Sequence, residues 1–404
     1  MARSNKTSAS KILRQLTAAC LLLTASIAAA EINVTGYAKS FAVAQDDLSN
    51  PFISTDKIYQ SQNSLRLMLE GFGERTVWQV HYELNPIFVS TDLGLDLPTF
   101  NVVGDSYRLT DIETSLSADS SRNQVYQNLD RFNVQFQFDA GDLTIGRQAI
   151  SFGSARMINP TDVFLPFDVR TFNTEYRTGV DAVRFQRPVG ELGEIDVGIV
   201  LGDNADSDTS AAFLQLRGNV NGKDLHLAVI EYADQSLIGV GLQSALGDFG
   251  FWFEAASVTG EEDYIRVSTG LDYAFTEFTF AQVEYHYNGA GQDDPDDYLS
   301  NLSTLPYQQG GIFLFGKEYL IPSVSVQLSP LWVTSATALI NLTDSSAFLS
   351  LAAEFNIAEN FYMDFGWYHF LGDDLEATAP GLPRFGSEYG PNPDMLYASI
   401  RYYF

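Results

Sequence analysis

The sequence predicts an all-β fold, a transmembrane antiparallel β-barrel of about eighteen strands, with sixteen as the alternative. Three observations lead to this prediction. Segments of about ten residues alternate apolar and polar side chains along most of the chain, the pattern of strands with one face in lipid and one in water. Short and longer connections alternate between these segments. The final segment ends on an aromatic residue, Phe404, at the last position of the chain.

Residues 1–30 have the features of a secretory signal peptide. A basic start without acids is followed by an apolar core at residues 16–27, and Ala28 and Ala30 form an A-x-A cleavage site. Cys20 allows a lipoprotein as an alternative, but most of the apolar run follows this cysteine instead of preceding it. We therefore divide the chain into a signal peptide, residues 1–30, and a β-barrel, residues 31–404.

The alternating segments are expected to be the membrane-crossing strands. The clearest example begins at Ile265, which with Val267 and Leu271 alternates with polar residues such as Arg266 and Ser268. The predicted strands are residues 32–43, 64–71, 76–86, 129–139, 142–150, 178–188, 194–202, 211–220, 223–233, 236–246, 249–258, 265–275, 278–288, 317–328, 331–342, 347–356, 361–370 and 396–404.

The lengths of the connections support this assignment independently of the alternation within the strands. Every second connection is short. The long ones all fall between the short ones, at residues 44–63, 87–128, 151–177, 289–316 and 371–395. Outer-membrane barrels have short periplasmic turns and longer extracellular loops, which predicts this sorting and places both chain ends in the periplasm. Asn221 and Gly222 predict a type I′ hairpin turn.

The last segment, residues 396–404, has one wholly apolar face, which ends with Ile400, Tyr402 and Phe404. It resembles the C-terminal signal of Gram-negative outer-membrane barrels, in which the last strand closes the barrel. We therefore expect it to pair with the strand that begins at Ile32, in the outer membrane of a Gram-negative bacterium. Outer-membrane lipids and lipopolysaccharide are then expected partners, for either a monomer or a homotrimer.

Charge and side-chain chemistry exclude several classes of function. The chain has 23 basic and 51 acidic residues, and loss of the four bases in residues 1–30 leaves 19 against 51, a net charge of −32. Nucleic acid is therefore not an expected partner. The four histidines have no metal-ligand spacing, so we expect neither a metal nor another cofactor. The acidic run at residues 292–297 is a solvated loop or, alternatively, a site for divalent cations.

Residues 151–177 are the candidate for a loop that narrows the barrel. Eighteen strands enclose a lumen wide enough for water, so a selective channel needs a constriction. This connection is less polar than the other long loops, and Ile158, Val163 and Phe164 need an apolar surface to pack against. It follows the fifth predicted strand, which is the position of the third extracellular loop that porins fold into the channel. We therefore expect it to fold inward.

Arginines are concentrated around this loop. Residues 129–190 contain seven arginines and seven acids, in a chain that is otherwise strongly acidic. Arginine binds carboxylate and phosphate groups in a bidentate fork. The arginines either form a cationic constriction for an anionic or polyhydroxy solute, or pair with the local acids and hold the loop on the wall. The candidate residues for the constriction and for solute binding are Arg131, Arg147, Arg156, Asp162, Asp168, Arg170, Arg177 and Arg184.

One of these arginines, Arg147, does not fit simple alternation, which puts it with Leu143 and Ile145 on the lipid side. Either Gly146 marks a bulge that resets the register, or Arg147 lies at the rim of the barrel.

Residues 145–153 and 159–162 read Ile-Gly-Arg-Gln-Ala-Ile-Ser-Phe-Gly and Asn-Pro-Thr-Asp, and resemble a pattern of alginate-export-like and phosphate-porin-like outer-membrane channels. The resemblance implies a porin of about eighteen strands that passes small hydrophilic solutes, with basic lumen residues that handle anionic ones. The alternatives are a barrel without a channel, for adhesion, assembly or as a sheath around a partner, and an outer-membrane hydrolase. No motif supports the hydrolase, so we expect no enzyme activity.

Overall fold

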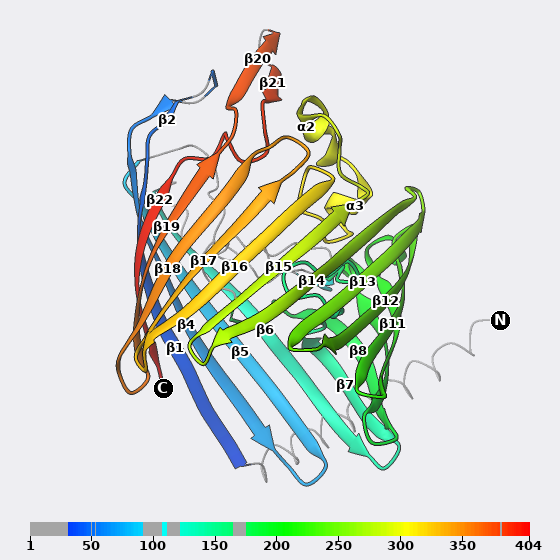
Figure 1. The fold of residues 1–404 in the computed structure, drawn as a ribbon. Coiled ribbons are helices and arrows are strands. Elements are labelled where there is room, and N and C mark those ends of the chain that lie inside the picture. The colour runs from blue at the N-terminus through cyan, green and yellow to red at the C-terminus, as the bar shows by residue number, and fades with distance from the viewer. Residues whose placement is uncertain are drawn as a thin grey trace, which may run out of the picture.

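A single closed sheet of eighteen antiparallel strands forms the body of the protein (Figure 1). The computed structural model describes residues 31–49, 51–52, 54–91, 107–110, 122–164, 175–379 and 382–404. The first strand, β1, pairs with the second strand of the barrel, β4, on one side and with the last, β22, on the other, which closes the barrel. The predicted fold class and the count of eighteen strands are therefore confirmed.

Neighbouring strands of the barrel also follow one another in the chain. They are β1 (Glu31–Gln45), β4 (Ile58–Phe72), β5 (Thr76–Val89), β6 (Asn123–Phe138), β7 (Gly141–Gln148), β8 (Val180–Val189), β9 (Gly193–Leu201), β10 (Ala211–Val220), β11 (Lys223–Tyr232), β12 (Gln235–Leu246), β13 (Phe249–Gly260), β14 (Tyr264–Thr276), β15 (Thr279–Asn288), β16 (Glu318–Ser329), β17 (Trp332–Asn341), β18 (Ala347–Ala358), β19 (Phe361–Leu371) and β22 (Met395–Tyr403).

Smaller elements lie at the end of the barrel that carries the longer connections. The strand pairs are β2 (Leu48–Ser49) with β3 (Ser54–Thr55), and β20 (Leu375–Ala379) with β21 (Leu382–Phe385), a hairpin that projects at the top of Figure 1. The short helices are η2 (Asp203–Ala205), η3 (Ser207–Thr209), η4 (Pro295–Asp297), α2 (Tyr298–Asn301) and α3 (Leu305–Gln308). Among the described residues, no helix has the length and apolar character needed to cross a membrane.

Each predicted strand corresponds to one strand of the barrel, and the two largest differences lie at strand starts. β4 begins at Ile58 instead of residue 64, and β6 begins at Asn123 instead of residue 129. The outward residues of the added part of β4 include Ser61 and Asn63. A barrel wall that continues past the hydrocarbon layer loses its apolar outer face, so alternation in the sequence stops before the strand does.

Both chain ends of the barrel lie at the end with the short turns, the lower end in Figure 1. One of these turns contains Asn221 and Gly222, whose φ angles of 54° and 75° are both positive, as the predicted type I′ turn requires. The backbone of Gly36 in β1 exchanges two hydrogen bonds with Phe404, at 2.8 and 3.0 Å. The predicted pairing of the last strand with the first is confirmed.

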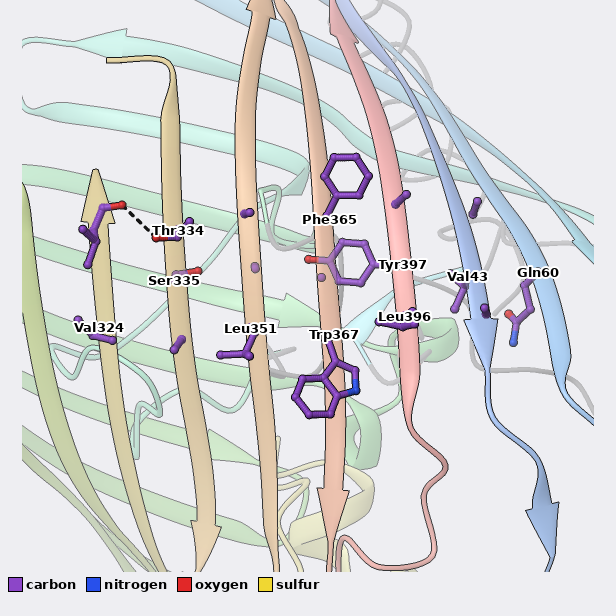
Figure 2. Close-up of a pocket in the computed structure, with 18 of the residues that line it drawn as sticks. Val43, Gln60, Val324, Thr334, Ser335, Leu351, Phe365, Trp367, Leu396 and Tyr397 are labelled. Atoms are coloured by element: carbon purple, nitrogen blue, oxygen red, sulfur yellow. Dashed lines mark hydrogen bonds between the residues drawn. The ribbon is translucent and has the colours of Figure 1, made fainter. Parts of the chain in front are cut away.

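The outer face of the barrel is apolar. Large side chains such as Ile265, Phe365 and Leu396 are each more than half exposed, because they point away from the lumen. Figure 2 shows Leu351, Phe365 and Leu396 around a shallow groove of about 900 Å³ that crosses β16 to β19, β22 and β1. An apolar band of this extent needs hydrocarbon as its solvent. The inner face carries the alternate, polar residues, and the candidate site lies there.

Candidate functional site

The connection between β7 and β8, residues 149–179, is called the inner loop below. Its first part, residues 151–164, lies inside the barrel against the inward side chains of β13, β14 and β15, which are six to eight strands away from β7 in the sheet. The predicted inward fold of the third long connection is therefore confirmed for these residues. The contacts that hold it there are specific and buried.

Glu254 of β13 holds one stretch of the inner loop. Its carboxylate accepts hydrogen bonds from the backbone N–H groups of Ser154, Ala155 and Thr161 at 2.5, 2.8 and 2.9 Å. The Thr161 hydroxyl donates a further bond at 2.7 Å. The side chain is fully buried. Hydrogen bonds to a charged acceptor are roughly twice as strong as neutral ones, and they offset the cost of burying the carboxylate.

Glu284 of β15 binds residues 156–158 of the inner loop, which lie between the residues bound by Glu254. It accepts from the backbone N–H groups of Arg156, Met157 and Ile158 at 3.0, 3.1 and 2.8 Å, and from the indole nitrogen of Trp252 at 2.8 Å. Glu284 is also fully buried. Two wall carboxylates therefore bind six backbone amides of one loop. Neither glutamate can be singled out from the sequence, because an inward Glu in an alternating strand has the same pattern as any other lumen residue.

The wall also donates hydrogen bonds to carbonyl groups of the inner loop. Ser268 and Arg266 of β14 donate to the carbonyl oxygens of Ile158 and Pro160 at 2.6 and 3.2 Å. Loop backbone is rarely buried, because its polar groups would lose their water partners. Here the wall supplies partners for both the amide and the carbonyl groups, so the loop can lie in the barrel interior.

The apolar side chains of the loop pack on the wall as predicted. Ile158, Val163 and Phe164 are almost completely buried. The rings of Phe152 and Phe164 lie with their centroids 5.1 and 6.4 Å from Phe213 of β10. The loop thus bridges two parts of the wall, β10 and β13 to β15, and does not hang freely from β7.

The returning end of the inner loop contacts the opposite wall. Glu175 forms ion pairs with Lys39 of β1 and Arg401 of β22, both at 2.9 Å, and accepts a hydrogen bond from Tyr403 at 2.5 Å. Burial raises the pKa of Glu175, but the hydrogen bond from Tyr403 and the charge of Lys39 outweigh it, so the pKa lies below its usual value. The adjacent Tyr176 stacks on Tyr37 with 5.8 Å between ring centroids.

Each candidate arginine among the described residues has a carboxylate partner. The pairs are Arg131 with Asp130 at 2.7 Å, Arg147 with Asp181 at 2.8 Å, Arg156 with Asp272 at 3.3 Å, Arg177 with Asp162, and Arg184 with Asp196 at 2.6 Å. The Arg156 side chain is 52% exposed, whereas the side chains of the other four are 4–14% exposed. Asp168 and Arg170 lie outside the described residues.

Asp162 is the most deeply buried acid of the described part of the inner loop, with a side chain 1% exposed. Burial raises its pKa to about 6, and the Arg177 guanidinium opposes this rise. The pair of Asp162 with Arg177 joins the two parts of the inner loop to each other.

Arg147 lies at the rim of the barrel, the second of the two positions that its sequence context allowed. It is the second-last residue of β7, it pairs in register with Asp181, and it donates a 3.0 Å hydrogen bond to the carbonyl of Thr110 from another loop. Gly146 has a φ of 113°, but the register with β6 and β8 runs through it without a shift. A bulge does occur at the β5–β6 pair, and it leaves both Asp130 and Arg131 buried.

The inner loop covers one wall of the lumen and leaves another open. On the covered wall, Glu254, Ser268 and Glu284 are fully buried. On β16 to β18, the inward residues toward the long connections, Ile321, Leu339 and Phe348, are also fully buried, but the inward residues nearer the short turns carry small hydroxyl side chains and keep access to solvent. The hydroxyl-bearing residues are Ser323, Ser325, Ser335, Thr337 and Ser350. Among the described residues, the inner loop therefore leaves the inner face of β16 to β18 uncovered toward the short turns.

The acidic run at residues 292–297 is partly neutralised by neighbours. Asp293 pairs with Lys317 at 2.5 Å, and Asp296 pairs with Arg384 of the β20–β21 hairpin. Within the described ranges, no group of three or more His, Cys, Asp or Glu residues is arranged to hold a metal ion. These contacts favour the interpretation as a solvated loop.

Comparisons with known proteins give likeness in structure but not in sequence. No family model and no curated protein matches the sequence. OccAB4 from Acinetobacter baumannii is similar in structure, with a TM-score of 0.56 and 10% identity over 93% of this chain and 98% of that chain. OprD from Pseudomonas aeruginosa has a TM-score of 0.55 and 10% identity over 93% and 95%. OccD3 (OpdP) of the same species has a TM-score of 0.53 and 8% identity over 92% and 91%.

These neighbours differ from the families that the sequence motifs resembled, so the alginate-export-like and phosphate-porin-like resemblance is not confirmed. At 8–10% identity the likeness concerns the fold. The chain therefore shares the barrel fold of the OprD and Occ outer-membrane proteins.

Proposed function

We propose that the protein is a porin, a channel in the outer membrane of a Gram-negative bacterium through which small hydrophilic solutes diffuse. The observation that carries the proposal is the inner loop, whose residues 151–164 lie in the lumen on two buried glutamates, Glu254 and Glu284, while the polar part of β16 to β18 nearer the short turns keeps access to solvent. A loop fixed in this way narrows a water-filled barrel without plugging it. The neighbours in structure are outer-membrane proteins as well, which favours the same location.

A second part of the proposal concerns the preference of the channel for anions or cations. Arg156 leaves about half of its side chain open to the lumen, so it is the candidate arginine best placed to contact an anionic group of a solute. Exposed carboxylates oppose this preference. The Glu354 and Glu175 side chains are 46% and 32% exposed, and both pair with the same base, Arg401. We propose a weak anion preference set by Arg156, with Arg131, Arg177 and Arg184 holding the loop and the wall.

Recording of single channels in planar lipid bilayers tests both levels of the proposal. The porin proposal predicts stepwise conductance in KCl, and its absence from well-folded protein would refute it. The anion preference predicts a reversal potential under a KCl gradient that moves toward cation selectivity in Arg156→Ala. Arg75→Ala is the matched control, because Arg75 is 70% exposed and lies in a short turn between β4 and β5. Cation selectivity of the unchanged protein, with no shift in Arg156→Ala, would overturn the anion preference alone.

Processing and partners are part of the same proposal. Residues 1–30 lie outside the described residues, and the first strand begins at Glu31, directly after the proposed cleavage site. Mass spectrometry of the outer-membrane protein is expected to find Glu31 as its N-terminal residue. Membrane lipids and lipopolysaccharide are proposed to cover the apolar outer face, and sedimentation in detergent distinguishes the monomer from the trimer.

A further inference from the structure

Aromatic side chains line one lumen wall at two depths. At the end of the barrel with the short turns, the rings of Tyr362 (β19) and Tyr403 (β22) lie 5.7 Å apart. Toward the other end, Tyr368 (β19) and Tyr397 (β22) lie 5.5 Å apart. Tyr362, Tyr397 and Tyr403 are partly exposed. We call these four tyrosines, together with the charged residues between them, Asp364 and Arg401, the tyrosine lane.

The middle of the tyrosine lane presents planar charged groups. Arg401 donates to Asp364 at 2.7 Å and forms ion pairs with Glu175 of the inner loop and Glu354 of β18. The Arg401 and Asp364 side chains are 15% and 14% exposed, so their edges face the lumen. Each charge here has an opposite charge beside it. The cluster can offer hydrogen-bond donors and acceptors to a solute without a strong preference for either sign of charge.

The wall geometry holds at least one ring of the lane in place. Figure 2 shows the Tyr397 ring reaching from β22 across β19. It lies over Gly366, where an added Cβ would come within 2.0 Å of the ring. The glycine lets the ring lie against the sheet, with its other face toward the lumen. Tyr37 and Phe41 of β1 are buried near the two ends of the lane. Tyr37 packs against the Tyr403 ring and Phe41 against the Tyr397 ring, so these buried rings support the partly exposed ones.

The lane is long enough for more than one small solute unit. Tyr397 and Tyr403 are six residues apart in one strand, which corresponds to about 20 Å at about 3.4 Å per residue. A solute that moves along β22 meets the Tyr397 ring, which is backed by the buried Tyr368, then the charged groups, and then the rings of Tyr362 and Tyr403. Beside this track, the small hydroxyl side chains of β16 to β18 leave room in the lumen.

We propose that the tyrosine lane is a binding track for neutral polyhydroxylated rings, that is, sugars of one to a few units, and this rests on the proposed channel. Aromatic faces bind the apolar C–H face of a pyranose ring, and orient it through the few polar groups placed beside them. The planar carboxylate and guanidinium groups of Asp364 and Arg401 are matched to pairs of sugar hydroxyls. A highly charged solute would have to compete with the existing ion pairs, so neutral sugars are favoured.

Blocking of the ion current by a sugar tests the proposal. A neutral linear glucose oligosaccharide is added to one side of a bilayer that holds single channels in KCl, and the half-blocking concentration is measured. The unchanged protein is expected to show brief, concentration-dependent blocks. Tyr397→Ala combined with Tyr362→Ala is expected to raise the half-blocking concentration about tenfold, the loss of roughly one ring contact at each end of the track.

Two controls separate ring contacts from general disturbance of the barrel. Phe365→Ala removes an aromatic ring from the same strand, but from its outer face, and is expected to leave the block unchanged. Tyr397→Phe keeps the ring and is expected to keep most of the block, which preserves the test if the alanine variants do not fold.

The outcomes separate the two proposals. Absence of KCl conductance refutes the channel itself. Normal conductance without a sugar block, or a block that the tyrosine substitutions leave unchanged, overturns the tyrosine lane and leaves the channel standing. Stronger block by a charged solute of equal size would also overturn the preference for neutral sugars.

Discussion

The two described parts of the inner loop are anchored in opposite ways. In residues 151–164, the loop supplies backbone N–H groups and the wall supplies the carboxylates of Glu254 and Glu284. At the returning end, the loop supplies the carboxylate of Glu175 and the wall supplies Lys39, Arg401 and Tyr403. The first two carboxylates are fully buried, whereas the Glu175 side chain is 32% exposed.

This difference shows which groups anchor each part of the loop to the wall. The polar contacts of the first part are made mainly by its backbone amides, and its apolar side chains such as Ile158 and Phe164 pack on the wall, so its polar anchoring depends on the two wall glutamates. The returning end is held largely through one side chain and the stacking of Tyr176 on Tyr37. The buried anchor should therefore be the stronger of the two, because solvent screens the exposed one.

The largest expected effect follows from removal of a wall carboxylate. Glu284→Ala leaves three loop amides and the Trp252 indole without their acceptor. Each unsatisfied buried donor costs about 1–3 kcal/mol, so we expect loop docking to weaken by about 3–6 kcal/mol after water enters the site. Single channels of this variant should have a higher conductance and more current noise. Glu277→Ala, in an exposed short turn, is the control. Equal conductance in both variants would show that Glu284 does not hold the loop.

A smaller effect is expected at the exposed anchor. Glu175→Gln keeps an acceptor for Tyr403 but removes the charge that pairs with Lys39 and Arg401. The cost should be about 1–2 kcal/mol, less than for a fully buried pair. The variant should show more frequent fluctuations of the current at an unchanged mean conductance, whereas Glu74→Gln in an exposed turn should not. A conductance increase as large as that of Glu284→Ala would contradict the ranking of the two anchors.

The smallest effect is a dependence on pH between 7 and 5. The pKa of Asp162 is raised to about 6 by burial, so the docked loop binds a proton that a free aspartate would not bind at this pH. Acidification through this range therefore stabilises the docked loop and should lower the current noise. The pKa of Glu175 is lowered below its usual 4.5, so its contribution is lost only at more acidic pH. Asp162→Asn should remove the change between pH 7 and 5, and a change that persists in this variant would have another origin.

The sequence predicts the barrel well because the lipid imposes a simple pattern on it. Alternation located every strand, and Phe404 located the closing pair with β1. The inward fold of the loop followed from apolar residues such as Ile158 and Phe164, which need a surface in a water-filled lumen. These features depend on local composition, and a single sequence contains that information.

The anchors could not be predicted in the same way. Glu254 lies 100 residues from Ser154, and Glu284 lies 126 residues from Ile158, so their contacts depend on where the loop crosses the barrel. The sequence shows that acids lie near the arginines, but it does not predict which arginine keeps an exposed side chain. Arg156 differs from the others because its partner, Asp272, comes from β14 and leaves much of its side chain open.

Hydrogen exchange of the inner loop tests the central claim most directly. The six amides held by Glu254 and Glu284, in residues 154–158 and 161, belong to the described stretch 151–164, which has no regular secondary structure. Mass spectrometry of the protein in lipid nanodiscs should find them exchanging as slowly as the strand amides of β13. Exchange as fast as in the exposed loop at Asp56 and Lys57 would contradict the claim that this loop is fixed across the lumen.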